Sequence, residues 1–297
     1  MDFSSRPATA ADAQAIYELI AAAEQEWHGQ VEVIPDQVAA DLVRPELDPE
    51  RDTLVVHAGN GDLAAWAWVH LGKHAQVNVV PSYRAAGIGT MLIGWVEERA
   101  REVGSDWVAQ IVDDADKAGT GLLQSRGHDV LATNWLLERP IDGQRSLEPV
   151  AGLRLGSYDA TRTEEVYELV EDAFSEFQPR RKSFAEFAGL TVERSTFRPD
   201  ASTLAYIGDD VVGAVISLDL PDSDEGYVER LAVRADHRNQ GIARAMLDET
   251  CAVFHRLGRR SCILWTHSGT GALAMYERLG MHVRRSTTVY RIHLWSG

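Results

Sequence analysis

The 297-residue chain has little cysteine, no long apolar run and a shortage of positive charge. Its two cysteines, Cys251 and Cys262, fit neither a disulfide framework nor a metal site, so we expect two small buried side chains. The histidines show no ligand spacing either, and no metal is expected. No stretch approaches the roughly 18 apolar residues of a membrane span, and the start, MDFSSRPATAADA, lacks a secretory pattern. We therefore expect no membrane partner and a cytoplasmic location.

Acidic residues outnumber basic ones, with 45 Asp and Glu against 29 Lys and Arg, for a formal net charge of -16. Proteins that bind nucleic acid neutralise phosphates with Lys and Arg, so this balance argues against a nucleic-acid partner. It fits a cationic acceptor drawn to an acidic cleft, and it fits equally an acidic surface that only maintains solubility. At roughly 100–200 residues per domain, the length predicts two domains.

The two halves of the chain begin with matching amphipathic helices. The first starts at Thr9 with Asp12 three residues on, and the second at Thr161 with Glu164, which is the spacing of a capping box. Apolar residues spaced i, i+3, i+4 and i+7 follow each start, and the segment IYELI of the first helix recurs as VYELV in the second. This recurrence predicts an internal duplication.

The duplication continues beyond the helices. The segments TLVVHAGNGDLAAWAWVHL and TLAYIGDDVVGAVISLDL each place two apolar runs around a turn, as in a hairpin. A strand, a glycine-rich turn and a helix follow in both halves, where Gly87 corresponds to Gly241 at an offset of 154 and Gly127 to Gly280 at 153. Each half therefore reads helix, hairpin, strand, helix, strand, helix, strand, which is a mixed α/β architecture.

A segment rich in proline, glycine and polar residues, ERPIDGQRSLEPVAG at 138–152, separates the two patterns. We therefore expect an N-terminal domain over residues 1–143 and a C-terminal domain over 152–297. Nothing in the sequence marks an exposed apolar face, so the oligomeric state is not predicted.

The turn after the central strand carries the strongest chemical signal in each half. It reads Arg84-Ala-Ala-Gly-Ile-Gly in the first and Arg238-Asn-Gln-Gly-Ile-Ala in the second. Small residues allow a ligand to approach the backbone, and the free N–H groups of the first helical turn favour an anion such as a pyrophosphate. A tight strand-to-helix turn without a ligand would give the same pattern. A dinucleotide fingerprint is not present, because the third glycine is missing.

The flanking residues make the pattern more specific. V-x-P-x-Y-R-x-x-G-I-G, L-A-V-x-x-D-x-R-x-x-G-I-A and the late segment MYERLGM resemble the GNAT acetyltransferase superfamily over both halves. The resemblance implies two tandem acyl-CoA N-acyltransferase domains, each a mixed, mostly antiparallel sheet flanked by helices. It implies that the turn and the strand before it bind acetyl-CoA, through Leu231, Ala232, Val233, Arg238, Asn239, Gln240, Gly241, Ile242, Ala243 and Arg244. The matching positions of the first half are Val77, Val79, Arg84, Ala85, Ala86, Gly87, Ile88, Gly89 and Thr90.

Acetyl transfer to an amine needs a base for the amine and a proton for the departing thiolate. The resemblance places Tyr276 where many members carry a tyrosine beside the sulfur, as general acid; the residue also fits a core tyrosine packed with Leu273 and Leu279. Glu229, on the central strand, is the candidate base, and it fits equally an exposed carboxylate paired with Arg230 or Arg234.

Two further features of the second half remain open. His267 follows a predicted strand and is either a second candidate base or a solvated loop residue. The segment EFQPRRKSFAEF at 176–187 is expected to begin the acceptor wall, and its basic residues suit either an acidic acceptor or solvent.

The first half departs from the pattern at both chemical positions. Leu123 stands at the Tyr276 position and Ala75 at the Glu229 position. Among tandem members of the family, such a layout implies one active half, here the C-terminal one. The N-terminal half then either still binds coenzyme A without catalysing or only shapes the acceptor pocket of the second half. The sequence predicts an acetyl-CoA-dependent N-acetyltransferase acting on a primary amine of a small molecule or peptide. The alternatives are a non-catalytic acetyl-CoA-binding regulator and a transferase using aminoacyl-tRNA, which the net charge opposes.

Overall fold

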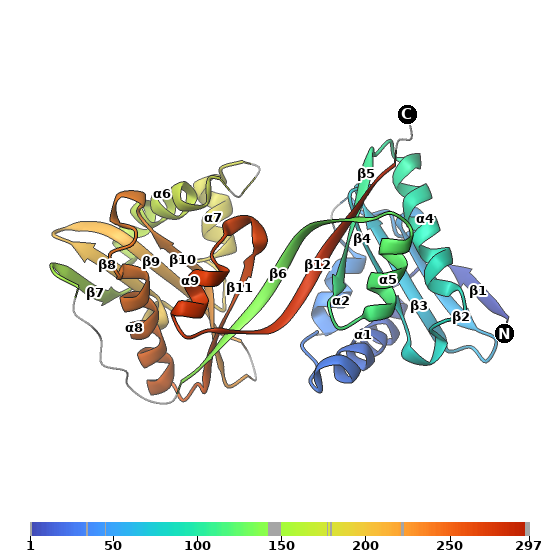
Figure 1. Ribbon diagram of the computed structural model, residues 1–297, viewed down its shortest axis with the longest axis horizontal. Helices are drawn as coiled ribbons and strands as arrows, with labels where there is room; N and C mark the ends of the chain where they lie inside the picture. The colour runs from blue at the N-terminus through green and yellow to red at the C-terminus, as the bar shows by residue number, and fades with distance from the viewer. Residues whose placement is uncertain are drawn as a thin grey trace. The chain divides into compact units, whose positions relative to one another are not determined.

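The computed structural model of the chain describes residues 2–33, 35–44, 46–141, 150–176, 178, 180–220 and 223–294. It divides into two compact units (Figure 1). The N-terminal unit comprises the chain up to Thr133 together with the segment from Ser286 onward, and the C-terminal unit is Asn134–Arg285. Among the described residues, no helix is long and apolar enough to cross a membrane.

The N-terminal unit has a six-stranded sheet in the order β1-β2-β3-β4-β5-β12. Neighbouring strands are antiparallel except β4 and β5, which are parallel. Its strands are β1 (Phe3–Arg6), β2 (Thr53–Ala58), β3 (Leu63–His70), β4 (His74–Val79), β5 (Trp107–Asp113) and most of β12 (His282–His293). Its helices are α1 (Ala13–His28), α2 (Pro35–Leu42), α3 (Pro49–Asp52), α4 (Ile88–Glu102) and α5 (Lys117–Ser125).

The C-terminal unit repeats this topology in the strand order β7-β8-β9-β10-β11-β6, with β10 and β11 as the parallel pair. Its strands are β7 (Leu153–Ser157), β8 (Thr203–Ile207), β9 (Asp210–Leu218), β10 (Glu225–Val233), β11 (Ser261–His267) and most of β6 (Asp129–Pro140). Its helices are α6 (Thr163–Phe174), α7 (Phe184–Leu190), α8 (Ile242–Arg256) and α9 (Leu273–Arg278). The predicted fold class, two tandem domains with mixed and mostly antiparallel sheets, is confirmed.

The last strand of each repeat belongs largely to the other unit. β6, which ends the first repeat, pairs with β11 from Asn134 to Pro140, and β12, which ends the second, pairs with β5. Figure 1 shows both strands running from one unit to the other. The compact units therefore differ from the contiguous halves, 1–143 and 152–297, that the sequence predicts. Part of the predicted join, 142–149, lies outside the described residues.

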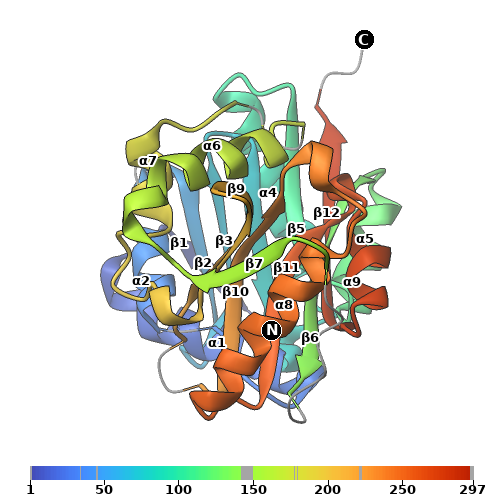
Figure 2. The same ribbon diagram turned by 90° about the vertical axis from the view of Figure 1, so that its left-hand side faces the viewer.

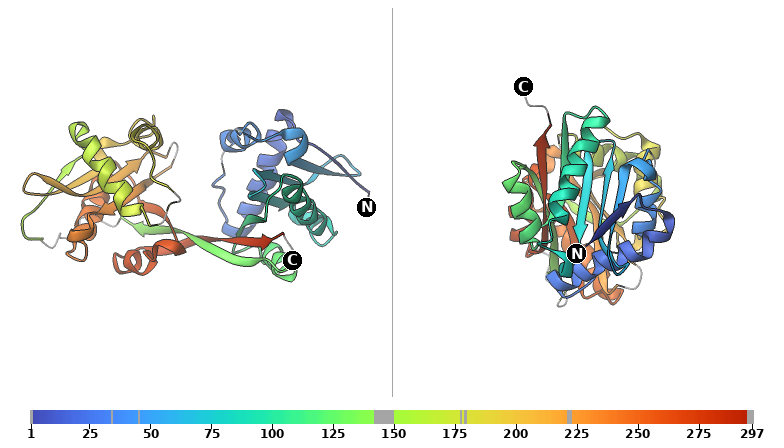
Figure 3. Two further views of the ribbon diagram at one scale, coloured as in Figure 1. Left: turned by 90° about the horizontal axis from the view of Figure 1, so that it is seen from above. Right: turned by 90° about the vertical axis from the view of Figure 1, so that its right-hand side faces the viewer.

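Each sheet is covered on both faces. In the C-terminal unit, α6 and α7 pack on one face around Val170 and Phe187, and α8 and α9 on the other around Met246 and Tyr276 (Figure 2). In the N-terminal unit, α1 and α2 cover one face and α4 the other (right panel of Figure 3). Apolar strand residues on both faces satisfy both helix layers, as expected for a three-layer α/β unit.

The helix starts are only partly as predicted. The capping box of Thr9 and Asp12 forms, on a short 3₁₀ turn just before α1. The second predicted box, Thr161 with Glu164, does not form. Asp159 caps the 3₁₀ turn before α6 instead, and its carboxylate accepts the N–H of Thr161 at 2.9 Å. Both cysteines are free and buried, as expected, in α8 and β11. The sequence pattern missed the edge strands β1 and β7 and the short helices α2, α3 and α7.

Candidate active site

The turn between β10 and α8 has the backbone of an anion-binding loop. Asn239 and Gly241 adopt left-handed conformations, with φ of 62° and 84°, which bend the chain directly into α8. No side chain caps the helix start, and the first backbone bond of the helix is that from the N–H of Ala245 to Gly241. The N–H groups of the preceding residues, Ile242 to Arg244, therefore point out of the helix and are free to bind an anion.

The strand β10 is interrupted by a bulge at Glu229. Val228 pairs with Ser217 on β9 and Arg230 pairs with the next residue, Ile216, so Glu229 has no cross-strand partner there. On its other side β10 pairs with β11 only as far as Tyr227 opposite Ile263. Beyond this point the edge of β10 at Leu231–Val233 faces no strand among the described residues, and its backbone groups are open to a ligand.

The opening between these strands is a cleft of about 740 Å³. It brings together most of the residues that the sequence predicted for this half: the base and acid candidates, the strand edge and the turn. They are Glu229, Leu231, Ala232, Val233, Arg238, Asn239, Gly241, Ile242, Ala243, Arg244, His267 and Tyr276. Gln240 does not line the cleft; its side-chain amide donates to the carbonyl of Asp236 at 3.3 Å. Arg244 donates to the carbonyl of Arg278 at 2.8 Å, so two arginines stand together at this wall.

Tyr276 lies at the boundary between core and cleft. It is 8% exposed and belongs to the apolar cluster that also contains Leu279 and Leu273, and it also lines the cleft. Burial, with a smaller contribution from Cys262, raises the pKa of its phenol to about 12. The side chain therefore remains a proton donor at neutral pH, and both alternatives raised from the sequence describe parts of its position.

Glu229 has features of both predictions, although its side chain is only 14% exposed. It lines the cleft at the bulge, and its Oε1 lies 2.7 Å from Nη1 of Arg230. Burial and the negative charge of Glu229 raise the pKa of Tyr227 well above its usual range, so a phenol O–H accompanies the carboxylate. His267 ends β11 and lines the same cleft rather than a separate surface loop.

The basic segment after α6 is held by internal ion pairs. Arg180 pairs with Glu186 at 2.5 Å, and Arg181 with Asp172 at 2.5 Å and with Glu168. Lys182 is the basic residue of this segment that lines the cleft. Phe177 and Pro179 of the predicted wall lie outside the described residues. This arrangement disfavours an acidic acceptor bound by Arg180 and Arg181.

The corresponding turn of the N-terminal unit keeps the backbone but not the surroundings. Ala85 and Gly87 have φ of 62° and 83°. The guanidinium of Arg84 lies 3.0 Å from Glu26 at the end of α1 and over the ring of Trp27. The predicted ligand positions of this half are thus Val77 and Val79 on β4, and Arg84, Ala85, Ala86, Gly87, Ile88, Gly89 and Thr90 at the turn and the start of α4.

Three features separate this unit from the C-terminal one. β4 pairs with β3 from His74 to Val79 without a register shift, so Ala75 occupies no bulge. Leu123 is buried, in a cluster with Tyr290. The last residue of α1, His28, places Nε2 2.9 Å from Oδ2 of Asp113, which ends β5. The end of α1 therefore contacts both the turn and the end of the parallel strand.

Comparison with known proteins agrees with this geometry. The sequence profile of the Acetyltransferase (GNAT) family matches residues 13–128 and 163–281, one match in each half. The matches cover most of the sequence, and the chain belongs to this family and is an N-acetyltransferase with tandem domains. The family uses acetyl-CoA, and acetyl transfer requires an acceptor substrate.

Similar proteins include relatives with the same two-unit length. The chain is 23% identical to a "Mycothiol acetyltransferase" of Catenulispora acidiphila over 95% of this chain and 96% of the relative. A GCN5-related N-acetyltransferase from Sphaerobacter thermophilus superposes with a TM-score of 0.81 at 25% identity, covering 99% and 96% of the two chains. A tandem GNAT protein from the clavulanic acid biosynthesis pathway has a TM-score of 0.72 at 17% identity, with both chains fully covered.

The described part of the chain shows no pattern of a metal site. Among the described residues, no group of three or more His, Cys, Asp or Glu side chains is arranged to hold a metal ion.

Proposed function

We propose that the C-terminal unit transfers the acetyl group of acetyl-CoA directly to a primary amine of a small molecule or peptide. One observation carries this proposal: a single cleft contains the free N–H groups of the turn, a carboxylate at a strand bulge and a protonated tyrosine. The turn would hold the pyrophosphate of acetyl-CoA, and the carboxylate and the phenol are the base and the acid that direct transfer uses.

The residues of the cleft fit acetyl-CoA along its length. The amides of Ile242 to Arg244 would hold the pyrophosphate, and the unpaired edge of Leu231–Val233 would hydrogen-bond the pantetheine arm. Gly241 suits this cradle because its φ of 84° is one that other residues rarely adopt. Bound there, acetyl-CoA supplies an activated thioester carbonyl.

The side chains then divide the proton transfers between them. Glu229 accepts the proton of the acceptor ammonium, directly or through water, and the free amine attacks the thioester carbonyl. A C–N bond forms as the C–S bond breaks, and Tyr276 donates its proton to the departing thiolate. The second proton that the nitrogen loses as the amide forms returns to the Tyr276 phenolate, directly or through water. The products are the N-acetylated amine and coenzyme A, with no covalent enzyme intermediate.

The proposal is tested by measuring both acetyl-CoA binding and acetyl transfer. Calorimetric titration of acetyl-CoA should give one site per chain, and amine-dependent release of the coenzyme A thiol should follow when acceptors are added. Glu229→Gln should retain acetyl-CoA binding and lower kcat by about 100-fold, because the base is lost while the cradle is intact. Glu249→Gln, on α8 outside the cleft lining, is the matched control.

The opposite outcomes have clear meanings. Acetyl-CoA binding without turnover on any amine would support the alternative, a non-catalytic acetyl-CoA-binding regulator. Absence of acetyl-CoA binding would overturn the proposal altogether. Full activity of Glu229→Gln would keep the transferase and remove Glu229 as its base, leaving His267 as the next candidate in the cleft.

A further inference from the structure

Two ion pairs line the same cleft beside the proposed base. On the sheet, Nη1 of Arg230 lies 2.7 Å from Oε1 of Glu229. On the helix side, Nζ of Lys182 lies 3.5 Å from Oε1 of Glu171. These pairs place two positive and two negative side chains on this part of the cleft lining, and the charges within each pair nearly cancel.

Contacts to the end of α6 connect the two pairs. The guanidinium of Arg230 lies over the ring of Phe174 at 5.9 Å. Phe174 follows Glu171 by three residues on the same helix, so the two side chains share a face of α6. Arg230 on the sheet and Glu171 with Lys182 on the helix therefore face one space rather than separate surfaces.

Arg230 has spare hydrogen-bonding capacity toward this space. Its contacts with Glu229, to the carboxylate and to the carbonyl oxygen at 2.8 Å, both use Nη1. Among the described residues, its Nε–Nη2 edge has no acceptor. The side chain is 32% exposed, so the edge is reachable from the cleft. Two parallel N–H donors match the two oxygens of a carboxylate.

Glu171, by contrast, is fixed. Its side chain is 2% exposed, and Oε2 accepts the backbone N–H of Lys182 at 2.8 Å and the side-chain N–H of Gln178 at 2.8 Å. These bonds hold the segment after α6 against the helix and keep Lys182 at the cleft. The side chain of Lys182 is 27% exposed, and its ammonium adds a second positive group beside that of Arg230.

This inference rests on the proposed function and names its substrate class. We propose that the acceptor is a zwitterion, an amine that also carries a carboxylate, as an amino acid does. The ammonium of the acceptor is placed at Glu229, and its carboxylate binds the Nε–Nη2 edge of Arg230 with Lys182 nearby. A zwitterion adds no net charge beside Glu229, Arg230, Glu171 and Lys182, whose charges already balance in two ion pairs. A purely cationic or anionic ligand leaves one charge unpaired there on desolvation.

The experiment compares matched acceptors in the full-length chain. Coenzyme A release is measured with acetyl-CoA and a panel of free amino acids, including β- and ω-amino acids and dipeptides. Each is tested beside its carboxamide and its decarboxylated amine. For the accepted side chain, kcat/KM should be at least about 10-fold higher for the free acid, because a carboxylate–arginine contact is lost in the other two.

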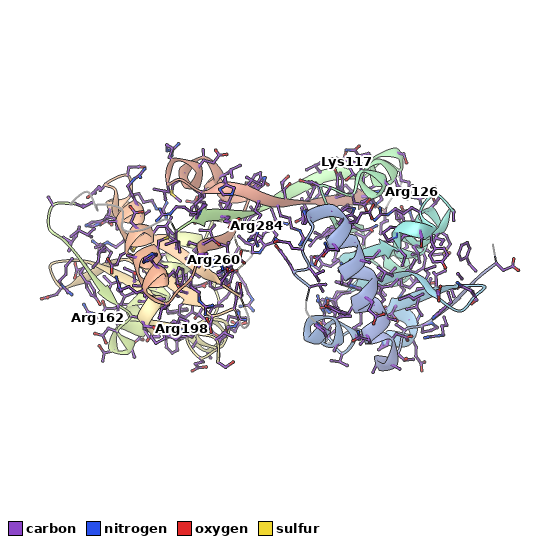
Figure 4. All side chains as sticks on the ribbon, turned by 90° about the horizontal axis from the view of Figure 1, so that it is seen from below. Lys117, Arg126, Arg162, Arg198, Arg260 and Arg284 are labelled. Carbon is purple, nitrogen blue, oxygen red and sulfur yellow. The ribbon has the colours of Figure 1, made fainter. Side chains whose placement is uncertain are left out.

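Variants assign this preference to the proposed residue. Arg230→Met should reduce the ratio of free acid to carboxamide to about 1, and Arg230→Lys should keep part of it, since a point charge replaces the fork. Neither should change the affinity for acetyl-CoA. Arg260→Met is the matched control, because Arg260 (labelled in Figure 4) has a side chain that is 84% exposed, lies just before β11 and does not line the cleft.

The failures can be told apart. If carboxamides or simple amines serve as well as free acids, or if no free acid is acetylated, the zwitterion is wrong. An unchanged ratio in Arg230→Met overturns the role of this residue. If calorimetry shows no acetyl-CoA binding to the wild-type chain, the proposed function itself fails first.

Discussion

The two units share a backbone but not a chemistry. Their turns superimpose in conformation, with φ of 62° and 83° at Ala85 and Gly87 against 62° and 84° at Asn239 and Gly241. The strands before the turns differ: β10 has a bulge at Glu229, and β4 pairs with β3 without one. The turn is therefore common to both units, whereas the bulge and the side chains around it are specific to the C-terminal one.

The first helix makes the second difference. α1 continues to His28, whose ring contacts Asp113, and Glu26 binds Arg84 of the turn. α6 ends at Phe174, and the segment beyond it turns back to form the wall with Lys182. The end of α1 therefore contacts both the turn and the end of β5, whereas α6 ends earlier. The comparison yields four predictions, in order of decreasing effect.

Introducing a negative charge at each of the two turns should have unequal effects on acetyl-CoA binding. Gly241→Glu places a carboxylate at the proposed pyrophosphate site and should weaken binding by more than about 100-fold. Gly87→Glu is its matched control, because the two glycines have nearly the same φ and the strain is alike. It should change affinity by less than about 3-fold. Calorimetry measures both, and equal losses would contradict the assignment of binding to the C-terminal turn.

Stability should depend on a buried arginine of the exchanged strand β6. Arg139 has 5% side-chain exposure and donates to Asp248 at 2.7 Å and to the carbonyl of Leu279 at 3.1 Å. Arg139→Ala leaves a buried carboxylate unpaired and should lower the free energy of unfolding by about 3–5 kcal/mol.

Arg126 of the N-terminal unit (labelled in Figure 4) is the residue for comparison. It pairs with Glu97, and its side chain is 30% exposed. Glu97 is itself buried, but Arg101 lies 3.8 Å from it, so Arg126→Ala does not leave this carboxylate unpaired and should cost only about 1 kcal/mol. Urea unfolding of both variants provides the measurement. A larger loss at Arg126 would mean that the exchanged strand contributes less to the C-terminal unit than its contacts indicate.

A third prediction concerns Tyr276 and Tyr290, one buried tyrosine from each unit. Tyr276→Phe should lower kcat by about 100-fold if the phenol protonates the thiolate. The pKa of about 12 keeps this phenol protonated at lower pH. The ratio of wild-type to variant kcat should therefore stay constant from about pH 7 to 10 and decrease only as the pH approaches that pKa.

Tyr290→Phe is the control in the N-terminal unit, where Tyr290 packs against Leu123. It removes the same hydroxyl from a cluster without the bulge, and it should leave kcat within about 2-fold. Equal effects of the two substitutions on kcat would indicate a structural rather than a catalytic role for the hydroxyl of Tyr276.

The smallest effects are expected in the basic segment after α6. Arg180→Ala and Arg181→Ala remove exposed cations that are paired with Glu186 and Asp172, so the acceptor KM should change by less than about 2-fold. Lys182→Ala should raise this KM by about 10-fold, because Lys182 lines the cleft. Initial-rate kinetics with varied acceptor separates the three, and a large effect at Arg181 would return this residue to the acceptor site.

Much of the site followed from local sequence patterns. The glycine-rich turns, the hairpins and the first helices are short-range features, in which the residues themselves specify backbone conformation or apolar periodicity. Tyr276 and Glu229 were identified through a resemblance in motif spacing, and the cleft contains both. The second capping box failed because Asp159, just outside the predicted spacing, reaches the amide of Thr161 first.

The sequence by itself determined the duplication, the α/β class and the position of the turns, because each depends on residues near one another in the chain. Only the tertiary structure decided which sheet each last strand joins, since β6 and β12 end equivalent repeats and carry patterns that suit either sheet. It also decided that Glu229 stands at a bulge and that α1 reaches both Arg84 and Asp113. Strand register and long-range contacts depend on residues far apart in the chain, and periodicity alone does not specify them.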